Sequence, residues 1–573
     1  MKITKSPKID AAVNDEDDSI NEDAIIQEEE KQLTKSKGKK SKSNLKITDV
    51  KKPEDSVSVP YIVTEDYIAE EIWSREKGSK PSFAVRVFRD YPTFNLSAGD
   101  IVTEVDGKPI RQLKYTNRQG DTITYVPVEN ALLTKGIVLV PQRPIPCTFD
   151  EVIKEGLNLA LKFYDCPEED MDMFRLLVLS AQASWFLDKY TQDFTNGKLN
   201  DEVKIAGMGM FSPIIAIRGG SSTGKNRLLG GLRVNAYHPM YESYTTRVAS
   251  LYRSLDIYKG SSLFLDEADS HSDENADINK YLDGRCQGSG YPRVNPSNVD
   301  QLDAFESFGY TAVTQRRGWD DNALEDRTIP FLATKSTRPN LPTVEPDEWI
   351  QEAFTLQNKL LYLRLKFWEQ VHIDRVYRLP YVSNQRLNAS LLVVHALEPQ
   401  AQNSITDMKD AALRIEFQKR EMKAESPDGQ IYNTIWEFIR KTPPVNHIVT
   451  GMYYIIKEID ITGINIPLTS KDIYTELGWN NINKNIRTIL HGLNLTGQAK
   501  ASSLPSFIKA GNKTFRPIWF DPKHLSVALN EFVRDYNPND SKENVWAYLK
   551  AEIQPTLQAT EVSIPENTTL DKV

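Results

Sequence analysis

The chain has 573 residues, a formal net charge of −9, 40% hydrophobic residues and 26% charged residues. This composition is that of a folded water-soluble chain, which excludes a wholly disordered, collagen-like or membrane-embedded protein. No apolar run reaches the roughly 18 residues that a spanning helix needs, and no apolar leader follows Met1, so we expect a cytoplasmic protein without a membrane partner. The three cysteines are widely separated and predict reduced thiols rather than a disulfide framework or a zinc site.

Residues 1–56 predict a disordered charged tail. An acidic block at 14–18 is followed by a lysine-rich block at 35–42, and the first aromatic residue of the chain is Tyr61. Such a segment buries too little apolar surface to offset the entropy of ordering it. It is either a solvated leader or a basic arm that touches nucleic acid or a partner.

The next two regions carry no catalytic constellation. Residues 57–147 predict a small α+β domain, because short stretches alternate in hydrophobicity as strands do. Residues 148–204 predict a helical region with apolar positions at helical spacing over 149–164 and 171–190. The candidate strands of the α+β domain cover 82–88, 100–106, 122–126 and 136–140.

Residues 205–344 predict an α/β core with a parallel sheet. Apolar strands alternate with helical segments, which favours crossover connections between parallel strands. The candidate strands cover 213–217, 260–265, 308–314 and 328–333. Each of the first three is followed by polar residues, so the carboxyl edge of this sheet is the place to look for chemistry.

A glycine-rich loop follows the first of these strands. Gly219 and Gly224, with Lys225 directly after, have the spacing of a phosphate-binding P-loop. Glycines let backbone N–H groups wrap a phosphate, and the following helix adds the positive end of its dipole. The alternative is a bare glycine-rich turn, but the strand before and the helix after favour nucleotide binding. The predicted nucleotide-binding residues are Gly219, Gly220, Ser221, Ser222, Thr223, Gly224, Lys225 and Asn226.

Asn226 departs from the usual P-loop pattern. Its position normally holds Ser or Thr, whose hydroxyl ligates Mg²⁺. An amide oxygen can also ligate this ion but is bulkier. Asn226 therefore stays a predicted metal ligand beside Asp266, and its effect on the rate of hydrolysis is open.

Two acids end the second core strand. Asp266 and Glu267 follow Leu263-Phe-Leu265, which is the Walker B arrangement. We expect Asp266 to hold Mg²⁺ and Glu267 to act as the general base toward water. The alternative is a solvated pair of turn residues. Asp269 and His271 are weaker candidates for a catalytic role, and the pattern favours solvated surface side chains for both.

Polar and basic residues after the third strand supply further candidates. Thr314 or Gln315 could orient the attacking water. Arg327 is the first candidate for an arginine that reaches a neighbouring subunit's site, with an ordinary intramolecular ion pair as the alternative. Second candidates for this role are Arg316 and Arg317, and Arg386 is a candidate sensor from a helical lid. The basic, glycine-rich stretch 280–293 is either a DNA-touching loop or a surface hairpin.

The C-terminal part predicts a helical lid at 345–427, a winged-helix domain at 428–535, and a helix and tail at 536–573. The winged helix rests on helices at 432–440, 468–478 and 480–490 and on a hairpin over 509–520. Residues 431–530 hold 11 Lys+Arg and 6 Asp+Glu, a net +5. This local charge favours DNA binding, with protein docking as the alternative. The predicted DNA contacts are Lys484, Asn485, Arg487 and Lys513, with Asn481 and Asn483 also on the recognition helix.

With these motifs the chain resembles the P-loop helicase-like ATPases of archaeal and viral mobile elements and replicons, in the AAA+/superfamily 3 neighbourhood. The resemblance covers about residues 120–400. It implies ATP and Mg²⁺ as cofactors, DNA as a partner, and a homo-oligomeric ring that is expected to be a hexamer. Asn226 is the departure from the family pattern. The resemblance is carried by residues 133–141, 217–225, 249–256, 262–269 and 309–327.

Three functions remain open at the level of sequence. The first is an ATP-dependent DNA helicase or replication-type ATPase. The second is a nucleotide-gated DNA-binding regulator with slow or no hydrolysis, which Asn226 favours. The third is a protein-remodelling ATPase. DNA-stimulated turnover separates the first from the other two.

Overall fold

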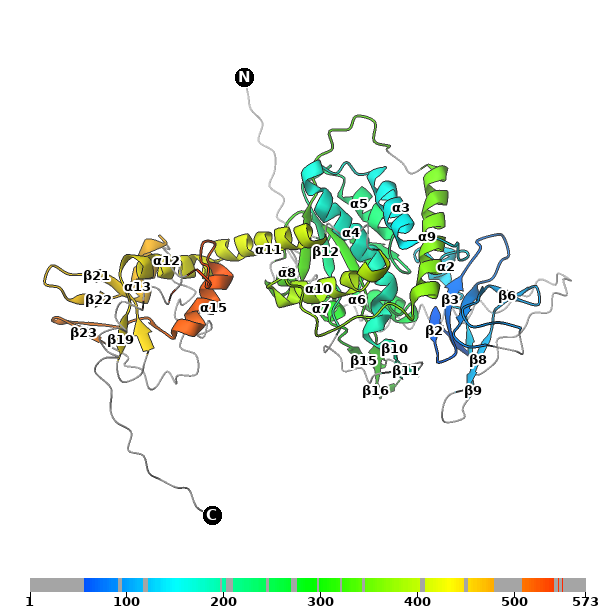
Figure 1. Cartoon of the computed structure of the whole chain (residues 1–573), viewed down its shortest axis with the longest axis horizontal. Coiled ribbons are helices and arrows are strands. Elements are labelled where there is room, and N and C mark those ends of the chain that lie inside the picture. Colours follow the sequence, from blue (N-terminus) through cyan, green and yellow to red (C-terminus); the bar gives the residue numbers. More distant parts are fainter. Residues whose placement is uncertain are drawn as a thin grey trace, which may run out of the picture. The chain divides into compact units, whose positions relative to one another are not determined.

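The fold is given by a computed structural model of the chain (Figure 1). The structure describes residues 56–90, 95–116, 122–195, 198–201, 210–243, 247–268, 276–295, 298–319, 322–342, 346–401, 408–447, 452–478 and 508–540, with Val545 and Leu549. The predicted charged tail lies outside these residues, apart from Ser56. So do Asp269, His271, and the second helix of the predicted helix-turn-helix with Asn481, Asn483, Lys484, Asn485 and Arg487.

The N-terminal region consists of short strands. An antiparallel sheet has the order β2-β3-β4-β5, and a second sheet has the order β1-β9-β8 with β1 parallel to β9. β6 and β7 form a small hairpin. The bounds are β1 Ser56–Ser58, β2 Tyr61–Val63, β3 Tyr67–Ile72, β4 Ser82–Val87, β5 Ile101–Val102, β6 Glu104–Val105, β7 Lys108–Pro109, β8 Leu113–Thr116 and β9 Thr122–Val126.

Two of the strand predictions in this region need correction. The strand expected over 100–106 is split into β5 and β6, which pair with different partners. The strand expected over 136–140 is wrong. It follows the short helix α2 (Ala131–Thr134), and a single bridge between Val138 and Met240 is its only pairing in the described chain. Val138 and Val140 are apolar because they are buried against the core, not because they alternate along a ladder.

The core is a five-stranded parallel sheet with the order β13-β14-β17-β12-β18. Its strands are β12 (Ile214–Arg218), β13 (Met240–Ser243), β14 (Leu263–Asp266), β17 (Thr311–Gln315) and β18 (Thr328–Leu332). The four predicted strands are confirmed, with ends shifted by a few residues, and β13 is additional. Because β17 lies between β12 and β14, its carboxyl end falls between the glycine-rich loop and the acidic pair.

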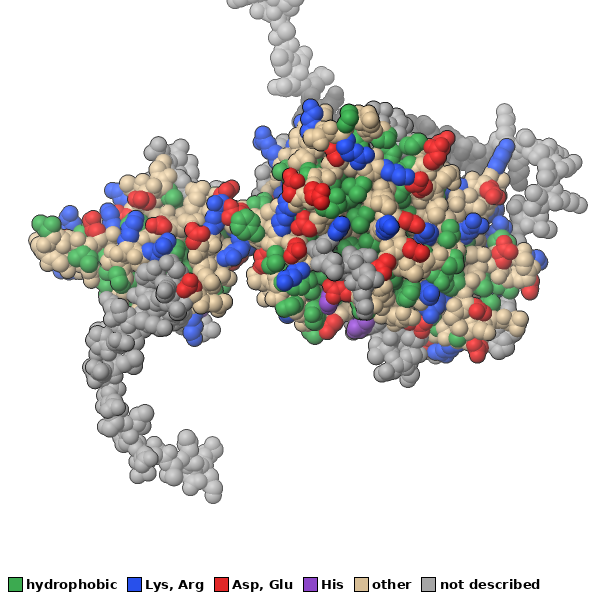
Figure 2. Space-filling view, turned by 45° about the horizontal axis from the view of Figure 1, so that its top comes forward, with side chains coloured by type: hydrophobic (Ala, Val, Ile, Leu, Met, Phe, Trp, Pro, Cys, Tyr) green, Lys and Arg blue, Asp and Glu red, His purple; other side chains and the backbone are tan. Residues whose placement is uncertain are grey.

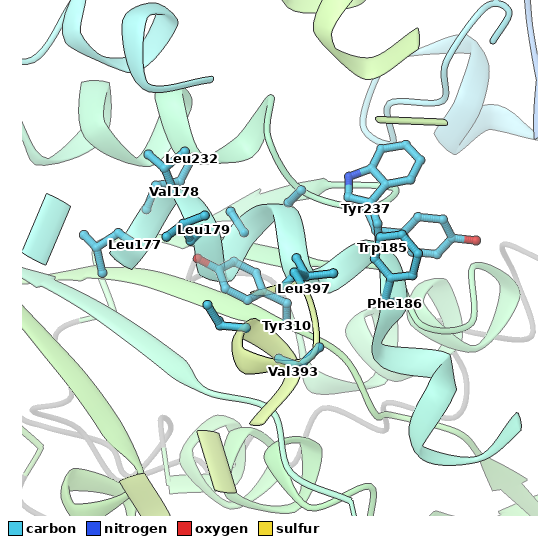
Figure 3. Packing of buried hydrophobic residues seen from close by; sticks show 14 of the residues in the cluster. Leu177, Val178, Leu179, Trp185, Phe186, Leu232, Tyr237, Tyr310, Val393 and Leu397 are labelled. Carbon is cyan, nitrogen blue, oxygen red and sulfur yellow. The ribbon is translucent and has the colours of Figure 1, made fainter. Parts of the chain in front are cut away.

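Both faces of this sheet are covered by helices. Along β12, Ile215 and Ile217 join one hydrophobic cluster, while Ile214 and Ala216 join another, as the two-residue period of a strand requires. The first cluster includes α3 (Phe149–Leu161), α4 (Met171–Ala183) and α5 (Lys225–Arg233), and the second includes α6 (Val248–Ile257), α7 (Ala276–Cys286) and α8 (Asn322–Asp326). Figure 3 shows residues of the first cluster, among them Val178 and Leu179 of α4 beside Leu232 of α5.

Further helices and hairpins surround the core. In Figure 1, α3 lies between α5 and the long helix α9 (Asp347–Phe367), and it contacts both. Two hairpins extend from the core, β10–β11 and β15–β16, and the stretch 280–293 is divided between α7 and β15. The remaining bounds are η2 Glu168–Asp170, η3 Ser184–Tyr190, β10 Gln192–Thr195, β11 Lys198–Asp201, β15 Tyr291–Asn295, β16 Asn298–Phe305, α10 Gln385–His395, η5 Glu398–Gln400 and α11 Met408–Glu425.

The C-terminal part has its own hydrophobic core. Apolar residues of α12 (Pro427–Lys441) pack against those of α15 (Pro522–Phe532), with Ile431, Ile435 and Leu529 fully buried. α13 (Ser470–Glu476) begins at a capping box of Thr469 and Asp472. The strands are β19 Val445–His447, β20 Met452–Tyr454, β21 Ile456–Ile459, β22 Asn465–Pro467, β23 Ile508–Ala510, β24 Lys513–Phe515 and β25 Trp519–Phe520. The hairpin β23–β24 turns at Gly511 and Asn512, as predicted for the wing.

The described surface matches the composition. On the face drawn in Figure 2, basic and acidic side chains are interspersed. No helix among the described residues is long and apolar enough to cross a membrane. Cys147, Cys166 and Cys286 are free thiols, and Cys286 is buried.

Candidate active site

The glycine-rich loop joins β12 to α5 in a conformation that needs its glycines. Gly219 has a φ of +154°, and a Cβ there would lie 2.6 Å from the carbonyl oxygen of Ala333. Gly224 has a φ of +82° and directly precedes α5. Side chains would be strained at both positions. The loop therefore leads its backbone to the N-terminus of α5, where the first N–H groups have no partner within the helix and favour an anion.

Lys225 is the first residue of α5 and its side chain folds back over the loop. Its Nζ donates to the carbonyl oxygens of Gly219 at 2.9 Å and Gly220 at 2.7 Å. The ammonium group thus lies at the concave side of the loop, within reach of a phosphate bound there. A phosphate would offer the same ammonium group an anionic acceptor, which can replace these carbonyl oxygens.

Asp266 ends β14 and gathers three donors around its carboxylate. Asn226 Nδ2 donates to Oδ2 at 2.6 Å, Tyr241 donates its hydroxyl to Oδ2 at 3.2 Å, and Thr314 Oγ1 donates to Oδ1 at 2.7 Å. Burial, followed by the charge of Asp266, raises the pKa of Tyr241 to about 12, so the phenol stays a donor. The structure thus brings the P-loop, the acidic strand end and the tip of β17 together, which the sequence motifs anticipated.

Glu267 is held in a strained backbone conformation. Its φ is +56°, which is uncommon outside glycine. Its backbone N–H donates to Thr314 Oγ1 at 2.8 Å, and its exposed side chain lines the same cavity as Lys225. The buried Thr314 hydroxyl therefore links both acids: it accepts from Glu267 and donates to Asp266. Strain of this kind gathers at functional sites, where surrounding contacts hold it in place.

The root of the loop is fixed by an ion pair between distant parts of the chain. Arg218 makes two bonds to Glu325 of α8, with Nη1–Oε1 at 2.7 Å and Nη2–Oε2 at 2.5 Å. Glu325 Oε2 also accepts from the backbone N–H of Trp319 at 3.0 Å. Such bidentate pairs fix geometry as well as adding energy. This clamp sets the position at which Gly219 leaves the sheet.

A cavity of about 480 Å³ opens over these residues. Its lining comes from the loop, from Glu267, Thr314, Gln315 and Arg316 at the strand ends, and from two further segments. These segments supply Phe163, Tyr164, Asp165, Thr334, Ser336 and Leu341. A lining that is partly polar and partly apolar is the usual form of a small-molecule pocket.

The arginine candidates lie in different surroundings. Arg327 pairs with Asp283 of α7 at 2.5 Å, and its side chain is only 13% exposed. Arg386 pairs with Asp326. Arg316 and Arg317 are exposed, and Arg316 lines the cavity of its own chain. Transfer of Arg327 to a neighbouring subunit's site would require the Asp283 pair to break.

Gln315 and Lys513 are the remaining candidate site residues. Gln315 is buried, and its Nε2 donates to the carbonyl oxygen of Ala268 at 3.3 Å. Lys513 is exposed on β24 of the C-terminal hairpin, far in sequence from the cavity-lining residues. Its predicted DNA contact stays a prediction, as do the roles of the other site residues.

The residues at the loop suit a hard cation. Among the described residues, no group of three or more His, Cys, Asp or Glu side chains could hold a metal ion. Mg²⁺ in nucleotide sites usually needs only one or two protein oxygens, since phosphates and waters supply the rest. Asp266 and Asn226 provide a carboxylate and an amide whose oxygen can turn toward such an ion.

Several functional contacts were not anticipated. Tyr241 comes from β13, which the hydrophobic pattern did not reveal. Arg218 stands directly before Gly219, and that position was a signal that could have been used. The lining residues at 163–165 and 334–341 carry no motif, because they meet the loop only through the fold.

Comparison with known proteins gives little further help. No protein-family model matches the chain, and no curated protein matches it. Among solved structures, the chain is similar to the apo NrS-1 C-terminal region, with a TM-score of 0.31 and 13% identity over 79% of this chain and 96% of that one. It is also similar to JCV helicase, with a TM-score of 0.19 and 14% identity over 44% of this chain and 68% of that one. At these scores the assignment of function rests on the geometry of the site.

Proposed function

We propose that this chain is a magnesium-dependent ATPase of the helicase or replication type that acts on DNA. One observation carries the ATPase part. Lys225 and Glu267 line one cavity at the carboxyl edge of one parallel sheet, and Asp266 bonds to Asn226 and Thr314 of the same lining. These are the positions of the phosphate ligand, the base and the metal ligand of a P-loop hydrolase.

Each residue has a role that follows from its position. The loop N–H groups and Lys225 bind the β- and γ-phosphates at the N-terminus of α5. Asp266 and Asn226 would hold Mg²⁺, which when bound neutralises phosphate charge. Glu267 takes the proton of the attacking water, and the Thr314 hydroxyl holds the Asp266 carboxylate and the backbone N–H of Glu267.

The DNA part of the proposal rests on charge. Residues 431–530 carry a net +5 within a chain of −9. Lys509 and Lys513 lie on the β23–β24 hairpin, which supports the predicted wing of a winged helix. Lysines on such a hairpin suit phosphate contacts rather than base reading. A homo-oligomeric ring belongs to the same proposal, but the pair that Arg327 makes with Asp283 favours an intramolecular role for this arginine over that of a finger.

Steady-state ATP hydrolysis tests this function. The full chain is assayed with Mg²⁺, with and without single- and double-stranded DNA, beside Lys225→Ala and Glu267→Gln. Glu267→Gln keeps the size of the side chain and the backbone bond to Thr314, so it isolates the proton acceptor. We expect DNA-stimulated turnover in the wild type and a loss of at least about a hundredfold in both variants.

A nucleotide-gated regulator is the second candidate, and one contact favours it. The Asn226 amide donates to Asp266, which occupies the oxygen that a metal would use. If the wild type binds ATP but hydrolyses it no faster than Glu267→Gln, the motor is excluded and the regulator is favoured. Hydrolysis without any effect of DNA would instead favour a protein-remodelling ATPase.

A further inference from the structure

Part of the cavity lining has no role in the phosphate chemistry. Tyr164 lies against the loop, because a Cβ on Gly224 would be 3.5 Å from its ring. Phe163 and Leu341 add apolar surface to the same cavity. If the phosphates occupy the loop, these lining residues are available to contact the nucleoside attached to them. The inference that follows therefore rests on the proposed nucleotide site.

This part of the cavity lining is built from two segments far apart in sequence. The chain after α3 supplies Asp165, and the chain after β18 supplies 334–342. Arg338 Nη1 donates to the carbonyl oxygen of Leu161 at 2.9 Å, and Arg227 of α5 donates to the carbonyl oxygen of Pro342. These contacts hold the 334–342 segment against α3 and α5 as one wall.

Asp165 joins the two segments with only one of its oxygens. Oδ2 accepts four hydrogen bonds: from Ser336 Oγ at 2.9 Å, from Thr337 N at 2.9 Å and Oγ1 at 3.3 Å, and from Arg338 N at 3.0 Å. No hydrogen bond or ion pair within the described chain uses Oδ1. Asp165 is half-buried and lines the cavity. Although burial opposes it, these hydrogen bonds hold the pKa of Asp165 below its usual value, so the group is a carboxylate.

We propose that Asp165 is the nucleoside-selecting residue of this site, with Oδ1 accepting a hydrogen bond from an N–H or O–H donor of the nucleoside. Two kinds of donor in ATP have this chemistry, the exocyclic amine of adenine and the ribose hydroxyls. A carboxylate accepts only, so it favours either donor over a group that lacks one. The fixed Oδ2 means that the carboxylate is already oriented before the ligand binds.

Asp165→Asn gives a sharp test because of how Oδ2 is held. An asparagine keeps its oxygen toward Ser336, Thr337 and Arg338, so its NH₂ group replaces Oδ1. The wall is preserved, while the acceptor toward the nucleoside becomes a donor. The matched control is Ser336→Ala, which removes one donor to Oδ2 and leaves Oδ1 unchanged.

The measurement is the dissociation constant for four ligands on the full chain. They are ATP, 2′,3′-dideoxy-ATP without ribose donors, purine riboside triphosphate without the amine, and inorganic tripolyphosphate. We expect Asp165→Asn to raise the dissociation constant for ATP by about tenfold to a hundredfold, as for a lost hydrogen bond to a charged group. The dissociation constant for tripolyphosphate should stay within about twofold of the wild-type value. One analogue should bind the wild type weakly, with an affinity that Asp165→Asn does not change. The group that this analogue lacks is the donor to Asp165.

Three results would overturn the proposal. The first is that ATP and both analogues have equal dissociation constants, and that these are the same for the wild type and Asp165→Asn. The second is an equal loss for tripolyphosphate, which would show that Asp165→Asn acts through the loop. The third is the same nucleoside-selective loss in Ser336→Ala, which would reduce Asp165 to a wall contact. ATP binding that is lost in Lys225→Ala would support the proposed site whatever Asp165→Asn shows, while a wild type that binds neither ATP nor tripolyphosphate overturns both proposals.

Discussion

Asn226 is the residue at which this site differs most from the usual P-loop. Its amide carries a donor and an acceptor, and the donor faces Asp266 Oδ2 at 2.6 Å. A metal ion between the two residues would need the amide to turn so that its oxygen faces the ion. Turning also breaks the hydrogen bond, so the free energy of that bond is subtracted from the free energy of metal binding.

We therefore predict opposite effects of two substitutions on the Mg²⁺ requirement. Asn226→Thr supplies the usual hydroxyl ligand and removes the competing amide, so half-maximal hydrolysis should need about threefold to tenfold less Mg²⁺. Asn226→Ala supplies no ligand and should need more. Titration of Mg²⁺ at fixed ATP measures both. Identical requirements in both variants and the wild type would show that Asn226 does not face the metal.

His238 is a second residue whose position has a measurable consequence. It is fully buried beside Glu70, with its ring 4.0 Å from that of Tyr237. Burial, and then the charge of Arg364, lowers the pKa of His238 to about 3, so the imidazole is neutral in the folded chain. Burial raises the pKa of Glu70 to about 7, against the opposing effect of Arg364.

The pH dependence of stability follows from these two shifts. Below its ordinary pKa near 6.5, His238 binds a proton only when unfolded, so its contribution to stability is lost as the pH falls. Glu70 acts in the opposite sense: its contribution is present below about 4.5 and is lost as the pH rises toward 7. Between pH 6.5 and 4.5 the two nearly cancel in the wild type.

We predict that His238→Asn removes this cancellation. Asparagine cannot titrate and tolerates the φ of +38° at this position. Relative to the wild type, the variant should gain about 1.4 kcal/mol for each pH unit below 6.5. Melting midpoints at pH 7.5, 6 and 5 measure this effect. The difference between the midpoints of the wild type and the variant should narrow as the pH falls. A gap that does not change with pH would mean that His238 is not kept neutral by folding.

At the scale of elements, α8 connects the nucleotide loop to two other parts of the core. The last two residues of α8 and the residue directly after it have three partners: Glu325 pairs with Arg218, Asp326 with Arg386, and Arg327 with Asp283. A displacement of the loop root is therefore felt by α10 and by α7. The stretch 280–293, whose contact with DNA the sequence left open, runs from α7 into β15.

A prediction about Arg327 follows from its pair with Asp283. We expect Arg327→Ala and Asp283→Asn to lower the melting midpoint by similar amounts, about 2–4 °C, and the double variant to be no worse than either. Hydrolysis should fall equally in both. A hundredfold loss of turnover in Arg327→Ala alone would instead support the finger, because only that role needs the guanidinium without Asp283.

The same elements show what the sequence can and cannot predict. Lys225, Asp266 and Glu267 could be assigned because each motif is local and stands at the end of an apolar strand. The Arg218–Glu325 pair joins residues 107 positions apart, and no local pattern encodes it. The stretch 136–140 is as apolar as a strand but is buried without a ladder, so hydrophobicity alone could not decide its structure.

At the scale of the whole molecule, α11 links the core to the C-terminal helices. It contacts α4 of the core and both α12 and α15. Lys423 of α11 lies 3.6 Å from Asp326 of α8 and 2.6 Å from Glu531 of α15. A single ammonium group thus touches the element that holds the loop root and the domain proposed to bind DNA.

We predict that Lys423→Gln uncouples DNA binding from hydrolysis. The pair with Glu531 is partly exposed, so its loss should not unfold either part. Hydrolysis without DNA and the affinity for DNA should stay within about twofold of the wild type, while stimulation by DNA should fall at least about fivefold, which corresponds to a coupling free energy of about 1 kcal/mol. Arg440→Gln is the matched control, because it removes the same charge from α12 at a residue whose ion-pair partner, Glu437, lies on the same helix. Equal stimulation in the wild type and both variants would show that the Lys423 contacts are not the route between the two sites, and a parallel loss in Arg440→Gln would show that net charge alone governs stimulation.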